Sequence, residues 1–206
     1  KPSGDLERLI AALENQWSLK KLQADLSILP KMQSILRKGG WKVTCAVHHS
    51  DENGTPQIIH LWPGFYEGSI YGMAVDLGST TIAAHLCDLQ TGNVIASSGL
   101  MNPQIRFGED LMSRVSYAMM NTNGDQEMTQ AVREGMDELF TKVAFDADID
   151  KELIMDSVFV CNPVMHHLFL GIDPFELGQA PFALATSNSI NLYAIQLGIN
   201  IHKNEI

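Results

Sequence analysis

Cysteine is scarce in this sequence, whose 206 residues include only three: Cys45, Cys87 and Cys161. No two of them form a C-x-x-C pair. Their wide spacing is typical of reduced thiols in an intracellular protein rather than of a disulfide framework. An iron–sulfur cluster is normally held by four thiolates, so three are one ligand short. The chain therefore cannot build such a cluster from its own cysteines alone.

Long apolar runs and clustered positive charges are missing as well. No run of about 18 apolar residues occurs, and the first residues, Lys1-Pro-Ser-Gly-Asp5, contain no signal-peptide core. The chain has 14 Lys and Arg against 24 Asp and Glu, a net charge of −10. Such a surface disfavours nucleic acid and anionic membranes, which bind clustered Lys and Arg. We expect a soluble, cytoplasmic protein with neither of these partners.

The sequence does contain a distinctive segment between Ile70 and Asn93. Its first apolar run, Ile70 to Val75, ends on the carboxylate Asp76. Its second apolar run, Ile82 to Leu89, leads to a Thr-Gly-Asn turn. Between the runs stand a glycine and three hydroxyl residues: Gly78, Ser79, Thr80 and Thr81. This pattern predicts a β-hairpin whose first turn carries backbone N–H groups, hydroxyls and one acid.

A turn of this kind suits a phosphate group. Successive N–H groups form an anion-binding nest, hydroxyls add donors, and a carboxylate can hold a hydrated Mg²⁺ ion. The turn is not a Walker loop, because the pattern G-x-x-x-x-G-K-[ST] does not occur. The simpler interpretation, an ordinary hairpin with a polar turn, remains open at this point.

Three segments resemble known proteins. The hexapeptide Asp76-Leu-Gly-Ser-Thr-Thr81 resembles the first phosphate loop of the superfamily of acetate and sugar kinases, heat-shock chaperone ATPases and actin. The segments Asn102–Val115 and Asn162–Pro174 resemble one branch of it, the ferredoxin-linked ATPases that act as reductive activators of corrinoid proteins. The resemblance is strong from Tyr71 onward and looser before it. One departure is Cys161, which stands where the family pattern has a glycine before Asn162.

The resemblance implies roles for individual residues. Asp76 would be the catalytic and metal-binding acid, which orients Mg²⁺ through water and aligns the attacking water or acceptor. A cofactor-binding role would fall to Gly78, Ser79, Thr80, Thr81 and Asn162. Each has a plainer alternative: Asp76 as a cap of the turn, Gly78 as a turn glycine, Asn162 as a helix N-cap. The nearby Asn102, Gln104, Arg106 and Asp110 are assigned no role, and a structural one is favoured.

For the whole protein, the resemblance implies a [2Fe-2S] domain, a linker with a middle domain, and an ATPase-like domain. Such a protein uses ATP and Mg²⁺ to pass an electron from its cluster to an oxidised corrinoid protein of a methyltransferase system. No second Asp-x-Gly-[Ser/Thr] follows residue 81. We therefore expect a fragment with half of the nucleotide cleft, inactive alone, with the cluster domain upstream. A homodimer is possible.

Two other classes of function stay open. One is a small-molecule kinase of the same superfamily, although no sugar-binding signature is found. The other is a non-catalytic docking or dimerisation module. A plant-type C-x₄-C-x₂-C pattern upstream in the complete gene would favour the reductive activator.

Periodicity predicts the elements along the chain. We expect helices over residues 5–17, 30–38, 108–120, 125–147 and 163–171, strands over 41–48, 57–62, 70–76, 82–89, 94–101 and 158–161, and a turn at Asp51–Gly54. The right-handed crossover rule places the last strand beside the 70–76 strand, which gives a ribonuclease-H-like topology.

The expected class is thus α/β, with an actin-type half-domain over residues 70–206. A helical linker over 1–40 and the β-hairpin of a small α+β middle domain over 41–69 precede it.

Overall fold

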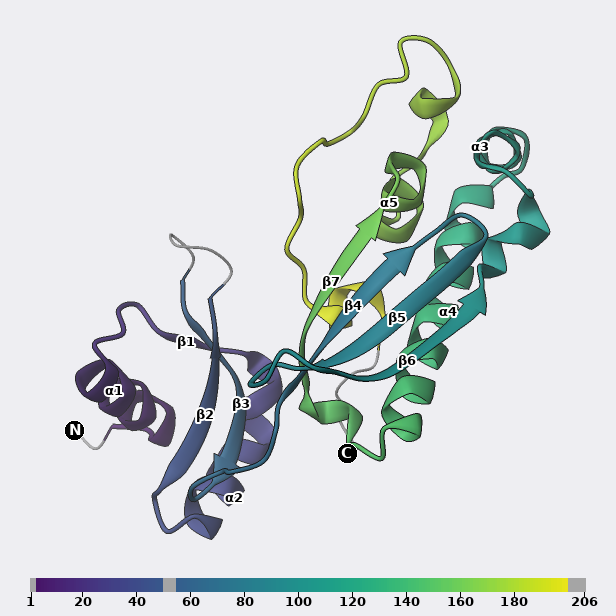
Figure 1. Ribbon diagram of the computed structural model, residues 1–206. Coiled ribbons are helices and arrows are strands. Elements are labelled where there is room, and N and C mark those ends of the chain that lie inside the picture. The colour runs from purple at the N-terminus through teal and green to yellow at the C-terminus, as the bar shows by residue number, and fades with distance from the viewer. Residues whose placement is uncertain (1–2, 50–54, 200–206) are drawn as a thin grey trace. The chain divides into compact units, whose positions relative to one another are not determined.

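The computed structural model describes residues 3–49 and 55–199, which fall into two compact units, Lys1–Gly68 and Ser69–Ile206 (Figure 1). The turn predicted at Asp51–Gly54 lies outside the described residues. Within the described part of the chain, no helix is both long and apolar enough to cross a membrane.

As far as it is described, the first unit combines two α-helices with a three-stranded sheet. The helices are α1 (Asp5–Trp17) and α2 (Leu29–Lys38), and the sheet has the order β1-β3-β2. Its strands are β1 (Gln23–Ala24), β2 (Val43–His48) and β3 (Gln57–Pro63). β2 and β3 form the predicted antiparallel hairpin, and β1 adds two residues parallel to β3.

Both helices are amphipathic, and their apolar sides are buried together with the hairpin. Leu9 of α1 and Leu36 of α2 belong to the same buried cluster as Ile58 and Leu61 of β3. A single hairpin buries little surface alone, so the helices supply its missing apolar layer. The segments expected as a linker (1–40) and as a hairpin (41–69) therefore share one core within Lys1–Gly68.

The second unit is built on a four-stranded sheet in the order β6-β5-β4-β7. The strands are β4 (Tyr71–Leu77), β5 (Thr81–Asp88), β6 (Val94–Met101) and β7 (Ile154–Cys161). The first three are antiparallel neighbours, and β7 runs parallel to β4. This is the predicted ribonuclease-H-like arrangement, and the α/β fold class is confirmed.

In the described residues of this unit, three α-helices accompany the sheet: α3 (Leu111–Met120), α4 (Gly124–Asp146) and α5 (Pro163–Leu170). α3 begins later than predicted because Asp110 caps it, its Oδ1 accepting from the backbone N of Ser113 at 2.7 Å. Short 3₁₀ helices belong to both units: η1 (Leu26–Ile28), η2 (Pro103–Phe107), η3 (Lys151–Leu153), η4 (Phe175–Gly178) and η5 (Ala194–Leu197).

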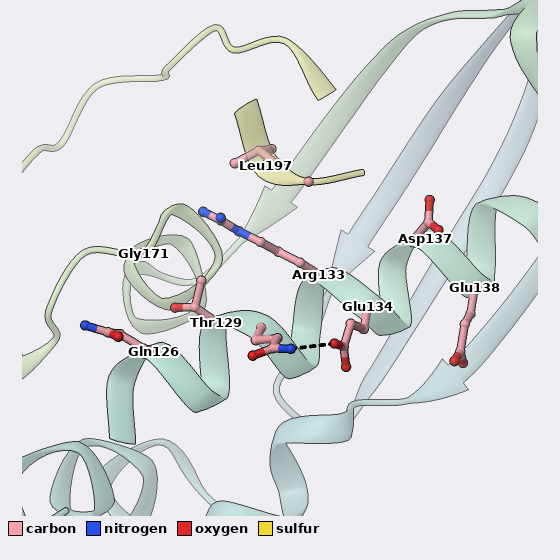
Figure 2. Close-up of a pocket in the computed structure, with 10 residues that line it drawn as sticks. Gln126, Thr129, Arg133, Glu134, Asp137, Glu138, Gly171 and Leu197 are labelled. Carbon is pink, nitrogen blue, oxygen red and sulfur yellow. Dashed lines mark hydrogen bonds between the residues drawn. The ribbon is translucent and has the colours of Figure 1, made fainter. Parts of the chain in front are cut away.

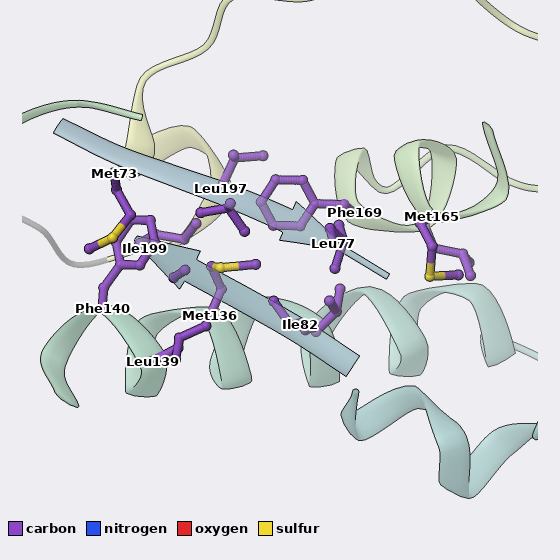
Figure 3. Packing of buried hydrophobic residues seen from close by; sticks show 14 of the residues in the cluster. Met73, Leu77, Ile82, Met136, Leu139, Phe140, Met165, Phe169, Leu197 and Ile199 are labelled. Carbon is purple, nitrogen blue, oxygen red and sulfur yellow. The ribbon is translucent and has the colours of Figure 1, made fainter. Parts of the chain in front are cut away.

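The core of the second unit lies between α4 and one face of the sheet. Figure 3 shows side chains of β4, β5 and α4 meeting there, with Phe169 of α5 and Leu197 and Ile199 from the C-terminal segment. The apolar stripe of α4 is fully buried: Met128, Val132, Met136, Leu139, Phe140 and Val143. Neither Leu197 nor Ile199 was predicted to belong to this core.

The opposite face of the sheet, here called the open face, is not covered by the described residues. Val158 and Val160 of β7 are 62% and 60% exposed there. In the described part of the chain, β7 is therefore not buried on both faces, although its apolar sequence is typical of a buried parallel strand. β7 also starts at Ile154 rather than at residue 158, because Asp156 can occupy this face without being buried.

Gly135 in the middle of α4 provides a test of the packing. Alanine is normally favoured over glycine inside a helix by about 1 kcal/mol. A Cβ at position 135 would lie 2.7 Å from Cγ of Pro103, however. We expect Gly135→Ala to lower the free energy of unfolding by roughly 1–3 kcal/mol through overpacking. Urea unfolding followed by circular dichroism measures this change in the free energy of unfolding.

Glu138→Ala is the control, because Glu138 is exposed on the same helix and should change stability by less than about 0.5 kcal/mol. A gain of stability in Gly135→Ala would contradict the close contact between α4 and η2.

Candidate functional site

Asp76 lies at the carboxyl end of β4, opposite Ala83 of β5 and Val160 of β7. β4 continues for one residue beyond the prediction, to Leu77, whose side chain is buried in the core. Alternation along the strand therefore places the exposed Asp76 carboxylate on the open face. It makes no hydrogen bond or ion pair with any residue that the structure describes. The carboxylate is thus available to a cation or to water.

The carbonyl groups of the turn between β4 and β5 are held by hydrogen bonds from Asn102 and Arg114. The side-chain amide of Asn102 donates to O of Gly78 at 2.8 Å, and the backbone N of Asn102 donates to O of Thr80 at 2.8 Å. Nη2 of Arg114 donates to O of Ser79 at 2.5 Å. All three carbonyls of residues 78–80 are therefore occupied by buried donors.

This arrangement determines where the N–H groups point. In a trans peptide the C=O and the following N–H point in opposite directions. Carbonyls held toward Asn102 and Arg114 thus turn the N–H groups of Ser79 and Thr80 away from them, and neither N–H donates to a described residue. Within the described chain, the hydroxyls of Ser79, Thr80 and Thr81 likewise have no partner. The turn therefore presents several unused donors, the condition for an anion-binding nest.

Glycine is required at position 78 by a close backbone contact within the turn. Its φ is not in the left-handed region, so backbone conformation does not demand glycine. A Cβ at position 78 would instead lie 2.5 Å from the carbonyl oxygen of Thr81. Only glycine allows the chain to close this tightly. Its proposed approach to a phosphate remains a prediction.

Asn162 lies at the same edge of the sheet as the turn. β7 is parallel to β4 and pairs Cys161 with Leu77, so Asn162 and Gly78 follow neighbouring strand ends. Asn162 caps α5, its Oδ1 accepting from the backbone N of Met165 at 3.0 Å. The capping role is therefore present. Its side-chain amide nitrogen has no partner among the described residues and stays available.

Cys161, the departure from the family pattern, does not share the face of Asp76. Its register partner Leu77 is buried, and the half-buried Cys161 side chain contacts the core cluster. Burial first, and the Asp76 carboxylate second, raise the pKa of the Cys161 thiol above its usual value. The thiol is therefore neutral near pH 7 and is not activated as a nucleophile.

The segment from Asn102 to Asp110, to which the sequence alone assigns no role, includes the residue that binds the turn through the Gly78 carbonyl, Asn102. Asn102 and Gln104 are 1% and 0% exposed, whereas Arg106 is exposed with its guanidinium 4.7 Å from the ring of Phe107. Arg114, which sequence reasoning did not single out, is also fully buried. An arginine in an amphipathic helix looks like a surface residue, and no local pattern marks it as buried.

A separate pocket of about 560 Å³ lies at the other end of α5 (Figure 2). There Thr129 donates from Oγ1 to O of Leu168 at 2.6 Å, and Nε of Arg133 donates to O of Phe169 at 2.9 Å. Both side chains satisfy terminal carbonyls of α5, next to Gly171. The pocket contains none of the predicted site residues.

Comparison with known proteins extends the local resemblance to the whole chain. The family model described as "RACo linker region" matches residues 1–68, and that described as "RACo middle region" matches residues 71–206. Their boundary coincides with the division between the two compact units. The expected division of this first stretch into a linker over 1–40 and a middle-domain hairpin over 41–69 stays a prediction.

Two relatives are informative. "Corrinoid activation enzyme RamQ" of Eubacterium limosum is 34% identical over 136 residues, 66% of this chain and 23% of the relative. A solved structure described as "Reductive activator for corrinoid,iron-sulfur protein" is 31% identical with a TM-score of 0.80, covering 96% of this chain and 31% of that chain. The chain thus spans less than a third of either relative. With both of its units matched, this chain belongs to the RACo family and contains its linker and middle regions.

Proposed function

We propose that this chain is part of an ATP-dependent reductive activator of a corrinoid protein. The relatives named for corrinoid activation support this role. The nucleotide-binding part of the proposal rests on the β4–β5 turn. There, Asn102 and Arg114 bind the turn's carbonyl groups, and its N–H groups and hydroxyls have no partner among the described residues. The Asp76 carboxylate, likewise unpaired in the described chain, lies beside them. Such a site matches the negative oxygens of a nucleotide polyphosphate and its metal ion.

The residues present fit Mg-ATP in a specific way. The Asp76 carboxylate would hold a hydrated Mg²⁺, which Mg²⁺ prefers because it loses its waters reluctantly. The N–H groups of Ser79 and Thr80, with the hydroxyls of Ser79, Thr80 and Thr81, would donate to phosphate oxygens. The amide of Asn162 would approach the same phosphates from the end of β7. A bound Mg²⁺ would neutralise phosphate charge and orient the terminal phosphoryl group.

The redox part of the function requires groups outside this chain. In the described residues, no cluster of three or more His, Cys, Asp or Glu side chains could hold a metal ion. We therefore place the [2Fe-2S] cluster in another domain of the complete protein. Its reduced form would give one electron to Co(II) of the corrinoid, which becomes Co(I). ATP would supply the free energy for this uphill transfer.

The experiment uses the complete protein, an electron donor and the oxidised corrinoid protein of a methyltransferase system, with cobalt oxidation state followed by visible absorption. We expect Co(I) to accumulate only when Mg-ATP is present. Equal rates without ATP would contradict the proposal. Transfer of phosphate to a small molecule would instead indicate a kinase, and binding of the corrinoid protein without hydrolysis would indicate a docking module.

A further inference from the structure

Arg114 is a charged side chain in an unusual position. It lies in the first half of α3 and is 0% exposed, so its guanidinium is shielded from solvent. Arginine is almost never fully buried without a charged partner. No carboxylate of the described residues lies within ion-pair distance of it, and Asp110 acts on it only at longer range.

Its hydrogen-bond partners are all neutral. Nε donates to O of Gly108 at 2.9 Å, and Nη1 contacts Oε1 of Gln104 and Sδ of Met165, each at 3.4 Å. Nη2 makes the shortest contact, 2.5 Å, to the carbonyl of Ser79 in the β4–β5 turn. The guanidinium therefore connects η2, α3, α5 and the turn while keeping its full positive charge.

The supporting side chains are themselves fixed. Nε2 of Gln104 donates to O of Met128 at 3.0 Å, and the Gln104 backbone N donates to Oδ1 of Asn102 at 2.9 Å. Asn102 in turn holds the Gly78 carbonyl. The buried network thus leaves Arg114 one orientation, with Nη2 directed at the turn.

Burying a charge without a counter-charge costs free energy that neutral hydrogen bonds recover only in part. Consistent with this, burial lowers the pKa of Arg114 below its usual value. Stability alone therefore does not explain an arginine here. The unused donors of Ser79 and Thr80 lie on the far side of the peptide that Arg114 holds, so an anion bound to them would supply the missing negative charge.

We propose that Arg114 is a positioning residue for a polyphosphate bound at the β4–β5 turn. By holding the Ser79 carbonyl it aims the Thr80 N–H outward, and its buried charge is neutralised by the bound anion. The inference rests on the proposed function for the identity of that anion, Mg-ATP. Binding of inorganic pyrophosphate tests it independently of any redox activity.

The test compares Arg114→Met, Arg114→Lys and Arg133→Met in the complete protein. Arg133 is the matched control, because it too donates to a backbone carbonyl, that of Phe169, but at the opposite end of α5. The Kd values of pyrophosphate and Mg-ATP are measured by calorimetry, KM and kcat for ATP hydrolysis are determined, and the unfolding midpoint is recorded for each variant.

We expect Arg114→Met to raise both Kd values about 30-fold or more, as loss of a charge-assisted contact implies. Arg114→Lys keeps the charge, but a lysine ammonium group cannot donate to Ser79, Gly108 and Gln104 in the same geometry. It should restore part of the affinity and leave Kd roughly 5-fold above wild type. The KM for ATP should rise more than kcat falls. Arg133→Met should shift the unfolding midpoint and leave both Kd values within about 2-fold.

Wild-type Kd values in folded Arg114→Met would overturn the inference. If that variant does not fold, wild-type affinity in Arg114→Lys would overturn it equally. A wild-type protein that binds neither pyrophosphate nor Mg-ATP would also refute it. A wild-type protein that binds both, with the expected loss in Arg114→Met, but never forms Co(I), would support the inference and contradict only the proposed function.

Discussion

Replacing Asp76 by Asn should lower ATP hydrolysis by the complete protein about 100-fold or more, the usual loss for one preorganised electrostatic group in an active site. The amide keeps the shape of the side chain and removes the charge that would hold hydrated Mg²⁺. Stability should change by less than about 0.5 kcal/mol, because the exposed carboxylate has no described partner to lose. Reduction of the [2Fe-2S] cluster, which we propose for another domain of the complete protein, should be unaffected. Cluster reduction should therefore survive while corrinoid activation fails.

Asp156→Asn is a matched control. Asp156 is an exposed acid paired with Gly72, so it stands on the open face like Asp76 but at the opposite end of the sheet. It lies four residues from Val160, the partner of Asp76, which is roughly 13 Å along the strand. Asp88 would be a poorer control, because it is buried and its Oδ1 accepts from two backbone N–H groups of the next turn, those of Gln90 and Thr91. The exposed Asp156 accepts a hydrogen bond from the backbone N of Ser157 at 2.8 Å.

Magnesium removal distinguishes the mechanism from a general charge effect. Chelation by EDTA should reduce hydrolysis by the wild-type protein to about the level of Asp76→Asn and should change the variant little further, because both treatments remove one metal interaction. Equal and near-wild-type rates in Asp76→Asn and Asp156→Asn would remove Asp76 from the mechanism. The turn would then be an ordinary polar hairpin turn.

The features that the sequence predicts well follow from local patterns or from the order of the elements. α1 begins and ends where its apolar spacing indicates, and the β4–β5 hairpin follows from two apolar runs around a polar turn. The position of β7 beside β4 follows from the handedness of crossovers, a rule that needs only the order of elements. Asp76 and Asn162 could therefore be placed at one edge of the sheet before the structure was known.

The features that the sequence does not predict depend on contacts between distant segments. β1 has two residues and is a strand only because β3 lies beside it. The burial of Leu197 and Ile199 depends on a segment without regular periodicity returning to the core. The support of the turn by Arg114 joins residues 35 positions apart through a backbone carbonyl, which no side-chain pattern reveals. The candidate ligand groups could thus be predicted, but not the network that orients them.

The largest loss of stability is expected for Phe140→Ala in α4. Phe140 is 0% exposed, its ring lies 6.2 Å from that of Phe159 on β7, and Phe159 lies 4.9 Å from Phe169 on α5. This aromatic series holds β7 and α5 to α4, and Asn162 stands between those two elements. Truncation should cost about 3–5 kcal/mol, since it removes a buried ring and leaves a cavity.

Phe145→Ala is the matched control, because Phe145 is on the same helix but 83% exposed, and it should change stability by less than about 0.5 kcal/mol. Urea unfolding followed by circular dichroism reports on the helices of both units. The three tryptophans, Trp17, Trp41 and Trp62, all precede residue 69, so their fluorescence gives the stability of Lys1–Gly68 in the same sample. Typical domains have only about 5–15 kcal/mol of stability. Phe140→Ala should therefore move the circular-dichroism transition to lower urea while the tryptophan-fluorescence transition stays in place. Similar losses in both phenylalanine variants would mean that the core does not lie between α4 and the sheet.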